Sequence, residues 1–95
     1  MAQEGVVIEA LAPLIGSEVS VLVELRTGGD DWTLLAAQHG VLRGPYGPES
    51  GADWFVGEHG ALSIPEAQLE SARRDGPVMF FDYGGVRVAV RPDAP

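Results

Sequence analysis

The feature that most constrains the fold lies near the C-terminus, where two strand-like runs flank a pair of glycines. Residues 78–83 are mostly aromatic or β-branched, Gly84 and Gly85 follow, and apolar residues alternate with others over 86–91. A two-residue glycine loop is typical of the tight turns that close antiparallel hairpins, because glycine adopts positive φ without penalty. We therefore expect a β-hairpin over residues 78–91.

The short loop also predicts the register of this hairpin. One face is wholly apolar, so the rest of the chain must cover it. The pairs expected on that face are Tyr83 with Val86, Phe81 with Val88 and Met79 with Val90. On the other face Asp82 lies opposite Arg87, which predicts a cross-strand ion pair. The remaining pairs expected there are Phe80 with Ala89 and Val78 with Arg91.

Three further strands are expected upstream of the hairpin. Apolar residues alternate over 18–26, a turn cluster follows at 27–31, and a mostly apolar run returns from Trp32. Such alternation indicates a strand with one buried face, and glycine with aspartate indicates a turn. A further short strand begins around Trp54. The loop at 44–53 between these strands is rich in glycine and proline.

One helix is expected at about 63–74. Ser63 and Glu66 have the spacing of a capping box, and Gly76 suits the residue that ends a helix. Residues 5–15 are ambiguous, because their apolar spacing fits a short helix or helical turn while their β-branched residues fit a first edge strand. The helical alternative is the one we favour.

Together these elements predict a single α+β domain over 1–95. Its sheet is small, mainly antiparallel and curved, with about five strands, and it either stays open or curls into a barrel. The predicted core is Val19, Val21, Val23, Leu25, Trp32, Leu34, Phe55, Met79, Phe81, Val86, Val88 and Val90. Leu22, Leu35, Phe80 and Val78 remain on opposite faces. One helix is too small to cover them, so we expect a homo-oligomer in which a second copy does so.

The run at 14–23, with Gly16 before alternating valines, resembles the opening of Sm-like RNA-binding proteins. In that family a short helix leads through a glycine into a strongly bent strand. The resemblance covers this run alone, and the asparagine that contacts base in the family has no counterpart here. It implies a small bent-sheet, SH3-like barrel as one architectural option, and none of the family's binding residues is carried over.

Charge excludes several classes of partner. The chain has 14 acidic and 6 basic residues and a formal net charge of −8. Phosphate recognition depends on clustered positive charge, so nucleic acid and anionic membranes are not expected partners. A basic protein partner fits better. The chain has no cysteine, and it shows neither a signal-peptide pattern nor an apolar run of membrane-spanning length, so we expect a cytoplasmic protein.

A degenerate repeat supplies the candidate metal ligands. Asp-Trp is followed by His-Gly at 31–40 and again at 53–60, which places His39 and His59 at similar positions. With Glu58 and one of Asp31 or Asp53, these histidines are a candidate metal site, since imidazole and carboxylate groups are common ligands. The same pattern is also expected without a metal site, if two adjacent strands have similar residues by chance or through an old duplication.

No nucleophile elbow, phosphate-binding loop or dinucleotide fingerprint is present, so we expect no cofactor and favour a non-enzymatic role over an enzymatic one, which stays open. The leading hypothesis is a small acidic protein-interaction module. The alternative is a small-molecule-binding domain, with Tyr46, Trp54 and Trp32 as candidate ligand-binding residues. A metal-dependent enzyme based on the histidines is a third hypothesis.

Overall fold

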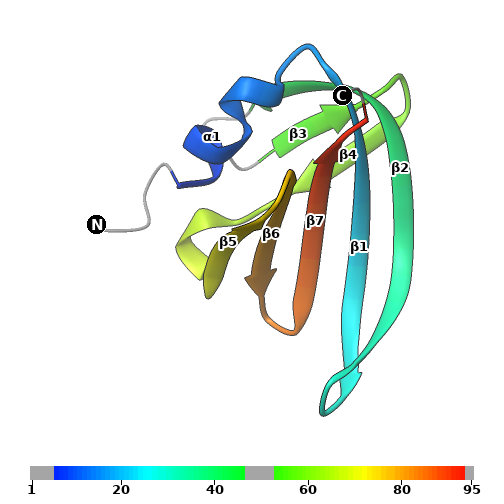
Figure 1. Cartoon of the computed structure of the whole chain (residues 1–95), viewed down its shortest axis with the longest axis vertical. Helices are drawn as coiled ribbons and strands as arrows, with labels where there is room; N and C mark the ends of the chain where they lie inside the picture. The colour runs from blue at the N-terminus through cyan, green and yellow to red at the C-terminus, as the bar shows by residue number, and fades with distance from the viewer. Residues whose placement is uncertain (1–5, 47–52, 94–95) are drawn as a thin grey trace.

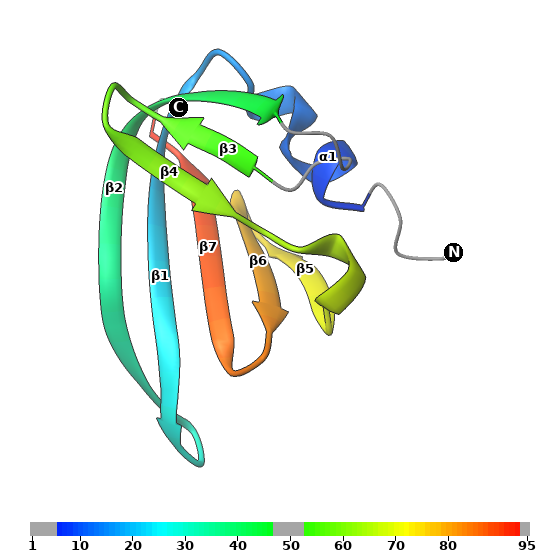
Figure 2. The ribbon, with the colours of Figure 1, turned by 180° about the vertical axis from the view of Figure 1, so that it is seen from behind.

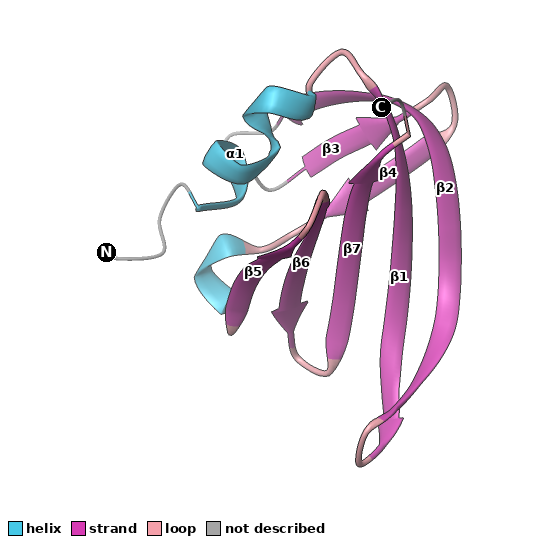
Figure 3. Ribbon diagram, viewed as in Figure 1, coloured by secondary structure: helices cyan, strands magenta, loops and turns pink. Residues whose placement is uncertain are grey.

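The computed structural model describes residues 6–46 and 53–93, which form one curved sheet with short helical segments (Figures 1 and 3). Strands dominate, as the colouring of Figure 3 makes plain. The elements in chain order are α1 (Val6–Leu11), the 3-10 helix η1 (Ala12–Leu14), β1 (Glu18–Gly28), β2 (Asp31–Tyr46), β3 (Asp53–Val56), β4 (Gly60–Ser63), the 3-10 helix η2 (Glu66–Gln68), β5 (Ser71–Asp75), β6 (Val78–Tyr83) and β7 (Val86–Pro92).

The described strands form one seven-stranded sheet in the order β4-β3-β2-β1-β7-β6-β5. Each pairing between neighbours is antiparallel. The predicted mainly antiparallel sheet is confirmed, but it has seven strands where about five were expected. It is also open, with β4 and β5 as its two edges, so it does not close into the barrel that the Sm-like resemblance suggested.

The long strand β2 bends and thereby folds the sheet over itself. Its first part pairs with β1, and its last part, from Leu42, pairs with β3. As a result β3 and β4 cross behind the other strands in Figure 1 and in front of them in Figure 2. Gly40 lies at the bend with φ of 154°. A Cβ there would lie 2.5 Å from the Cα of Gly57, so the close approach of the two backbones requires glycine.

The core fills the space between β3–β4 and the strands they cross, and α1 packs at one end. Val7 and Leu11 of the helix and Trp54 of β3 are fully buried. The buried apolar cluster comprises Val7, Leu11, Val19, Val21, Leu42, Trp54, Val56, Leu62, Ile64, Leu69, Phe81, Val88 and Val90. Of the predicted core, Val19, Val21, Phe81, Val88 and Val90 are confirmed as buried, and Val23, Met79 and Val86 pack against the cluster.

For three residues the prediction that they lie in the core is wrong. Leu25, Leu34 and Phe55 are exposed by 38%, 54% and 39%. In β3 the inward positions are Trp54 and Val56, so Phe55 points outward. Leu25 pairs with Val86 at the start of β7, and Leu34 pairs with Glu24 one level further along, so both lie near the end of the sheet, where their side chains stay exposed. Trp32 is half-buried and lies outside the core cluster.

The C-terminal hairpin has the predicted register. Tyr83 pairs with Val86, and the following pairs match as far as Met79 with Val90. The predicted ion pair across the hairpin is wrong, because Asp82 and Arg87 each bind a neighbour on the outer side. Asp82 accepts from Arg73 at 2.8 Å, and Arg87 donates to Glu24 at 2.9 Å. The flanking strands β5 and β1 supply these closer partners.

The predicted helix at 63–74 is wrong. Residues 60–63 form β4, η2 makes a single turn, and Ser71–Asp75 forms β5, which pairs with β6. Ser63 Oγ donates to Asp53 Oδ1 at 2.7 Å, not to a helical amide. A helix here would leave the backbone of β6 without a partner on that side, and pairing outweighs a weak local preference. The favoured short helix at the N-terminus is confirmed, and its strand alternative is wrong.

Candidate functional site

A groove crosses β2, β1, β7 and β6 on the face of the sheet that points away from the core, which we call the outer face. Its volume is about 480 Å³. Strand side chains alternate between the two faces, so Val19 and Val21 enter the core while Ser20, Leu22 and Glu24 line the groove.

Small residues beside large ones create the hollow. Leu22 pairs with Ala37 on one side and with Ala89 on the other, and Ala89 pairs with Phe80. The side chains of Ala37 and Ala89 are short, so the space beside Leu22 and Phe80 is unfilled. These four residues, with Val78, give the groove an apolar floor.

Polar residues stand in the next row of the sheet, at one end of the groove. Ser20 pairs with His39 on β2 and with Arg91 on β7, so the three side chains occupy one level across three strands. All three line the groove. The floor is thus apolar, and a hydroxyl, an imidazole and a guanidinium border it.

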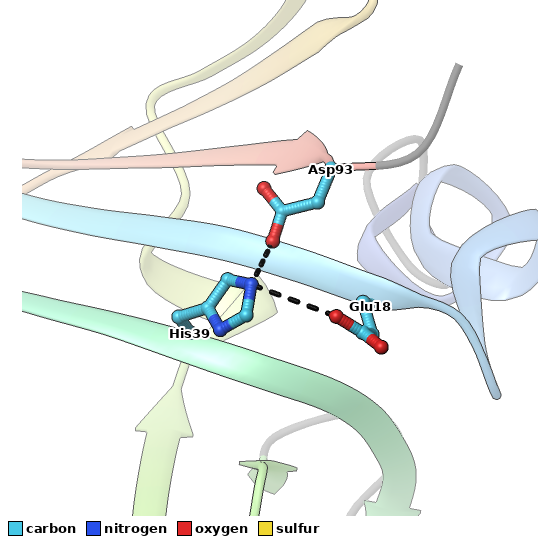
Figure 4. Close-up of side chains that lie close together, drawn as sticks. All are labelled: Glu18, His39 and Asp93. Carbon is cyan, nitrogen blue, oxygen red and sulfur yellow. Dashed lines mark ion pairs between the residues drawn. The ribbon is translucent and has the colours of Figure 1, made fainter.

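His39 lies between two carboxylates (Figure 4). Its Nε2 contacts Asp93 Oδ2 and lies 3.7 Å from Glu18 Oε1. The other Asp93 oxygen accepts a hydrogen bond from Ser20 Oγ at 2.6 Å, and the Asp93 amide donates to the Glu18 carbonyl at 2.9 Å. The cluster therefore ties the end of β7 to β1 and β2.

The cluster limits the chemistry available. Its three ligand atoms, one nitrogen and two oxygens, lie within 4.8 Å of one another, so Glu18, His39 and Asp93 are the described residues that could hold a divalent metal. A serine nucleophile needs its hydroxyl beside a histidine base. Here the Ser20 hydroxyl donates to Asp93, so His39 is not placed to take its proton.

The predicted metal ligands are not all brought together. His59 lies in the β3–β4 turn with 94% of its side chain exposed, and its contact is Glu58 at 3.9 Å. The described cluster around His39 contains neither of them. Glu18 and Asp93 were missed because they are distant from His39 in sequence. Their approach depends on β1 lying between β2 and β7, which no local motif indicates.

The predicted aromatic ligand-binding residues lie outside the groove. Trp54 is in the core. Tyr46 is exposed, and its ring meets that of Phe55 edge-on at 5.2 Å. The guanidinium carbon of Arg87 lies over Trp32, 4.1 Å from the centroid of the tryptophan ring. Of the loop at 44–53 around which this hypothesis was built, residues 47–52 lie outside the described residues.

Most charges along the outer face are internally compensated. Arg87 pairs with Glu24, and Arg73 pairs with Asp82. The same guanidinium of Arg73 lies 4.7 Å from the ring centroid of Phe80, a cation–π distance. Arg91 differs, because no described residue forms an ion pair or a side-chain hydrogen bond with its guanidinium.

Comparison with known proteins finds no matching protein family, no similar curated protein and no similar solved structure. Within residues 6–46 and 53–93, no helix combines the length and hydropathy that crossing a bilayer needs. The function must therefore be inferred from the exposed surfaces themselves.

Proposed function

We propose that this protein is a non-enzymatic interaction module that docks a basic protein partner through an arm formed by β1 and β2. The arm comprises residues 25–35. Its tip at the turn between β1 and β2 extends past the turn between β6 and β7 (Figure 1), while Leu25 at its base still pairs with Val86 of β7. The observation that carries the proposal is its exposed leucines. Leu25, Leu34 and Leu35 are exposed by 38%, 54% and 57%.

Apolar side chains on a protruding element are typical of surfaces that another protein covers. Leu34 pairs with Glu24 and Leu25 with Thr33, so the two leucines occupy adjacent pairs of one ladder and point to opposite faces of the arm. A bulge in this ladder leaves Leu35 without a cross-strand partner. A partner that covers one face of the arm would bury the leucine on that face at about 1.5–3 kcal/mol, and a partner that wraps around the arm would bury leucines on both faces.

The charge of the arm favours a basic partner. Asp30 and Asp31 lie at its turn, both exposed and neither paired with a described cation. The one arginine of the arm, Arg26, is engaged with the Trp32 ring at 5.1 Å. The net charge of −8 adds long-range attraction for a cationic surface and repulsion for an acidic one.

An amphipathic peptide of leucine and lysine tests this proposal by fluorescence anisotropy. Binding should weaken in the Leu34→Ser/Leu35→Ser variant and as salt rises, because both burial and charge contribute. The matched control is Ile15→Ser, which removes an exposed apolar side chain outside the arm. Equal binding of a leucine–glutamate peptide, or an unaffected double variant, would refute the docking surface.

The homo-oligomer expected from the sequence would use the same leucines. Light scattering on the wild type should then report a mass above that of one chain, and the Leu34→Ser/Leu35→Ser variant should be monomeric. A monomeric wild type would remove the oligomer while leaving the basic partner open to the peptide test. A cytoplasmic location is part of the proposal, since a chain without cysteine fits a reducing compartment.

A further inference from the structure

We infer that the groove on the outer face binds a small monocarboxylate with an apolar body, such as an aryl-alkanoic or branched aliphatic acid. None of the arm leucines Leu25, Leu34 and Leu35 lines the groove, although Leu34 borders it through its strand partner Glu24. The inference is thus independent of the proposed docking function. It rests on the shape of the groove, on its apolar floor and on the positive charge of Arg91, with which no described residue forms an ion pair.

The groove has the size and lining of a small-molecule site. A volume of about 480 Å³ lies within the range of roughly 300–1,000 Å³ that ligand pockets occupy. The floor is apolar, with Phe80 on one side of Ala89 and Leu22 on the other. An aromatic or branched aliphatic group would lie over Ala89 and bury apolar surface that is otherwise in contact with water.

Arg91 supplies the charge that selects the ligand. Three ionisable residues line the groove: Glu24, His39 and Arg91. Glu24 is neutralised by Arg87, whose Nη2 lies 2.8 Å from its carboxylate. His39 faces Asp93 and Glu18. Arg91 alone has no described counter-charge.

The carboxylates near the groove, those of Asp93 and Glu18, do not neutralise Arg91. One oxygen of Asp93 accepts a hydrogen bond from Ser20 Oγ, and the other is buried against His39 Nε2. The Glu18 carboxylate lies 3.7 Å from His39 Nε2 (Figure 4), and it forms no ion pair with Arg91. An incoming carboxylate would meet a guanidinium with free N–H groups, for which a bidentate pair is the favoured geometry.

The register of the sheet places the two parts of the site at the right separation. Arg91 pairs with Ser20, and Ala89, two residues along β7, pairs with Leu22. Residues two apart on a strand share a face and are about 7 Å apart. A ligand with a carboxylate on Arg91 therefore needs a linker of a few bonds before its apolar group reaches Ala89.

Titration of phenylbutyrate into the intact chain, followed by proton–nitrogen correlation NMR, tests the inference. Phenylbutyrate should shift the amides of Leu22, Ala89 and Arg91. Phenylbutyramide, which lacks the charge, and acetate, which lacks the apolar body, should each bind at least about tenfold more weakly, as expected when a charge-assisted contact or the apolar burial is lost. Equal binding of the amide, or no groove shifts at millimolar phenylbutyrate, would overturn the inference.

Two variants with matched controls assign the binding to the groove. Arg91→Gln should weaken phenylbutyrate binding about tenfold or more, whereas Arg74→Gln, at an exposed position outside the groove, should not. Ala37→Leu should fill the hollow and also weaken binding, whereas Ala61→Leu on β4 should not. Both alanines are exposed, so these changes are compatible with folding. Unchanged binding by Arg91→Gln and Ala37→Leu would place the ligand elsewhere and refute the assignment.

Discussion

Replacement of the adjacent residues Trp54 and Phe55 by alanine tests which face of β3 enters the core. Trp54 is fully buried, pairs with Leu62 of β4, and has its ring against Gly44, where a Cβ would lie 2.8 Å from Trp54 Cε3. Phe55 is partly exposed and touches Tyr46 and Arg43 at the surface. We expect the tryptophan variant to lose far more stability than the phenylalanine variant.

The magnitudes follow from burial. A buried tryptophan removes about 150–250 Å² from water, worth roughly 4–6 kcal/mol at ~25 cal/mol per Å², and large aromatic-to-alanine changes cost about 3–5 kcal/mol. We therefore expect Trp54→Ala to lower the free energy of unfolding by about 4 kcal/mol. For Phe55→Ala we expect about 1 kcal/mol, because that side chain keeps much of its surface in water and its ring contact is worth roughly 0.5–1.5 kcal/mol.

Urea unfolding followed by far-ultraviolet circular dichroism measures both values, because that signal does not depend on the tryptophan removed. The free energy of unfolding of a 95-residue chain is about 5–14 kcal/mol, so Trp54→Ala is expected to remove a large part of it. Trp54→Leu is a milder companion if the alanine variant does not fold. A larger loss for Phe55→Ala than for Trp54→Ala would show that β3 has the opposite face inward and would refute the core described above.

Three further predictions concern single sites. Gly40→Ala should destabilise the fold by roughly 2–5 kcal/mol in the same urea assay, because its Cβ would meet backbone 2.5 Å away, whereas Gly28→Ala meets nothing within 4 Å and should be nearly neutral. Burial raises the pKa of the Tyr83 phenol, so its stabilising effect is complete below the ordinary pKa of about 10 and is lost as pH rises through the folded-state pKa. Unfolding measured across alkaline pH should therefore show a decline that Tyr83→Phe reduces and Tyr46→Phe does not; an identical decline in both would contradict this. Zinc added to micromolar protein should give no heat in isothermal titration, because the cluster of Glu18, His39 and Asp93 offers three ligand atoms where structural zinc sites have four; a zinc heat that His39→Ala abolishes would instead identify a metal site.

In the repeated His-Gly pair, the two glycines are in similar surroundings but the two histidines are not. Both glycines lie at close approaches, since a Cβ on Gly40 would meet Gly57 and one on Gly60 would lie 2.2 Å from Gln38 Oε1. The preceding histidines differ, with His39 in the cluster with Asp93 and Glu18 and His59 in solvent. The steric demand on the backbone thus accounts for the glycines, and the pattern carries no common role for the histidines.

Local chemistry was sufficient for the C-terminal hairpin and its register, whereas it left residues 5–15 open between a short helix and an edge strand. A diglycine loop between alternating runs leaves few other conformations, and each of these interactions spans only a few residues. The same holds for the strand that begins at Glu18, where Val19 and Val21 are buried as their alternation indicates. In these segments the information needed for the structure lies within the segment.

Only the tertiary structure decided the conformation of β5, the inward face of β3, and the groove with its neighbouring cluster. In each case the residues that interact are far apart in the sequence. Ser71–Asp75 carries helix signals, yet it forms β5 since β6 offers an unpaired backbone edge. The inward face of β3 depends on the bend in β2, which a short apolar run cannot reveal. The groove and the cluster at Asp93 exist only because β7 returns to lie beside β1, so their residues meet through strand pairing that spans most of the chain.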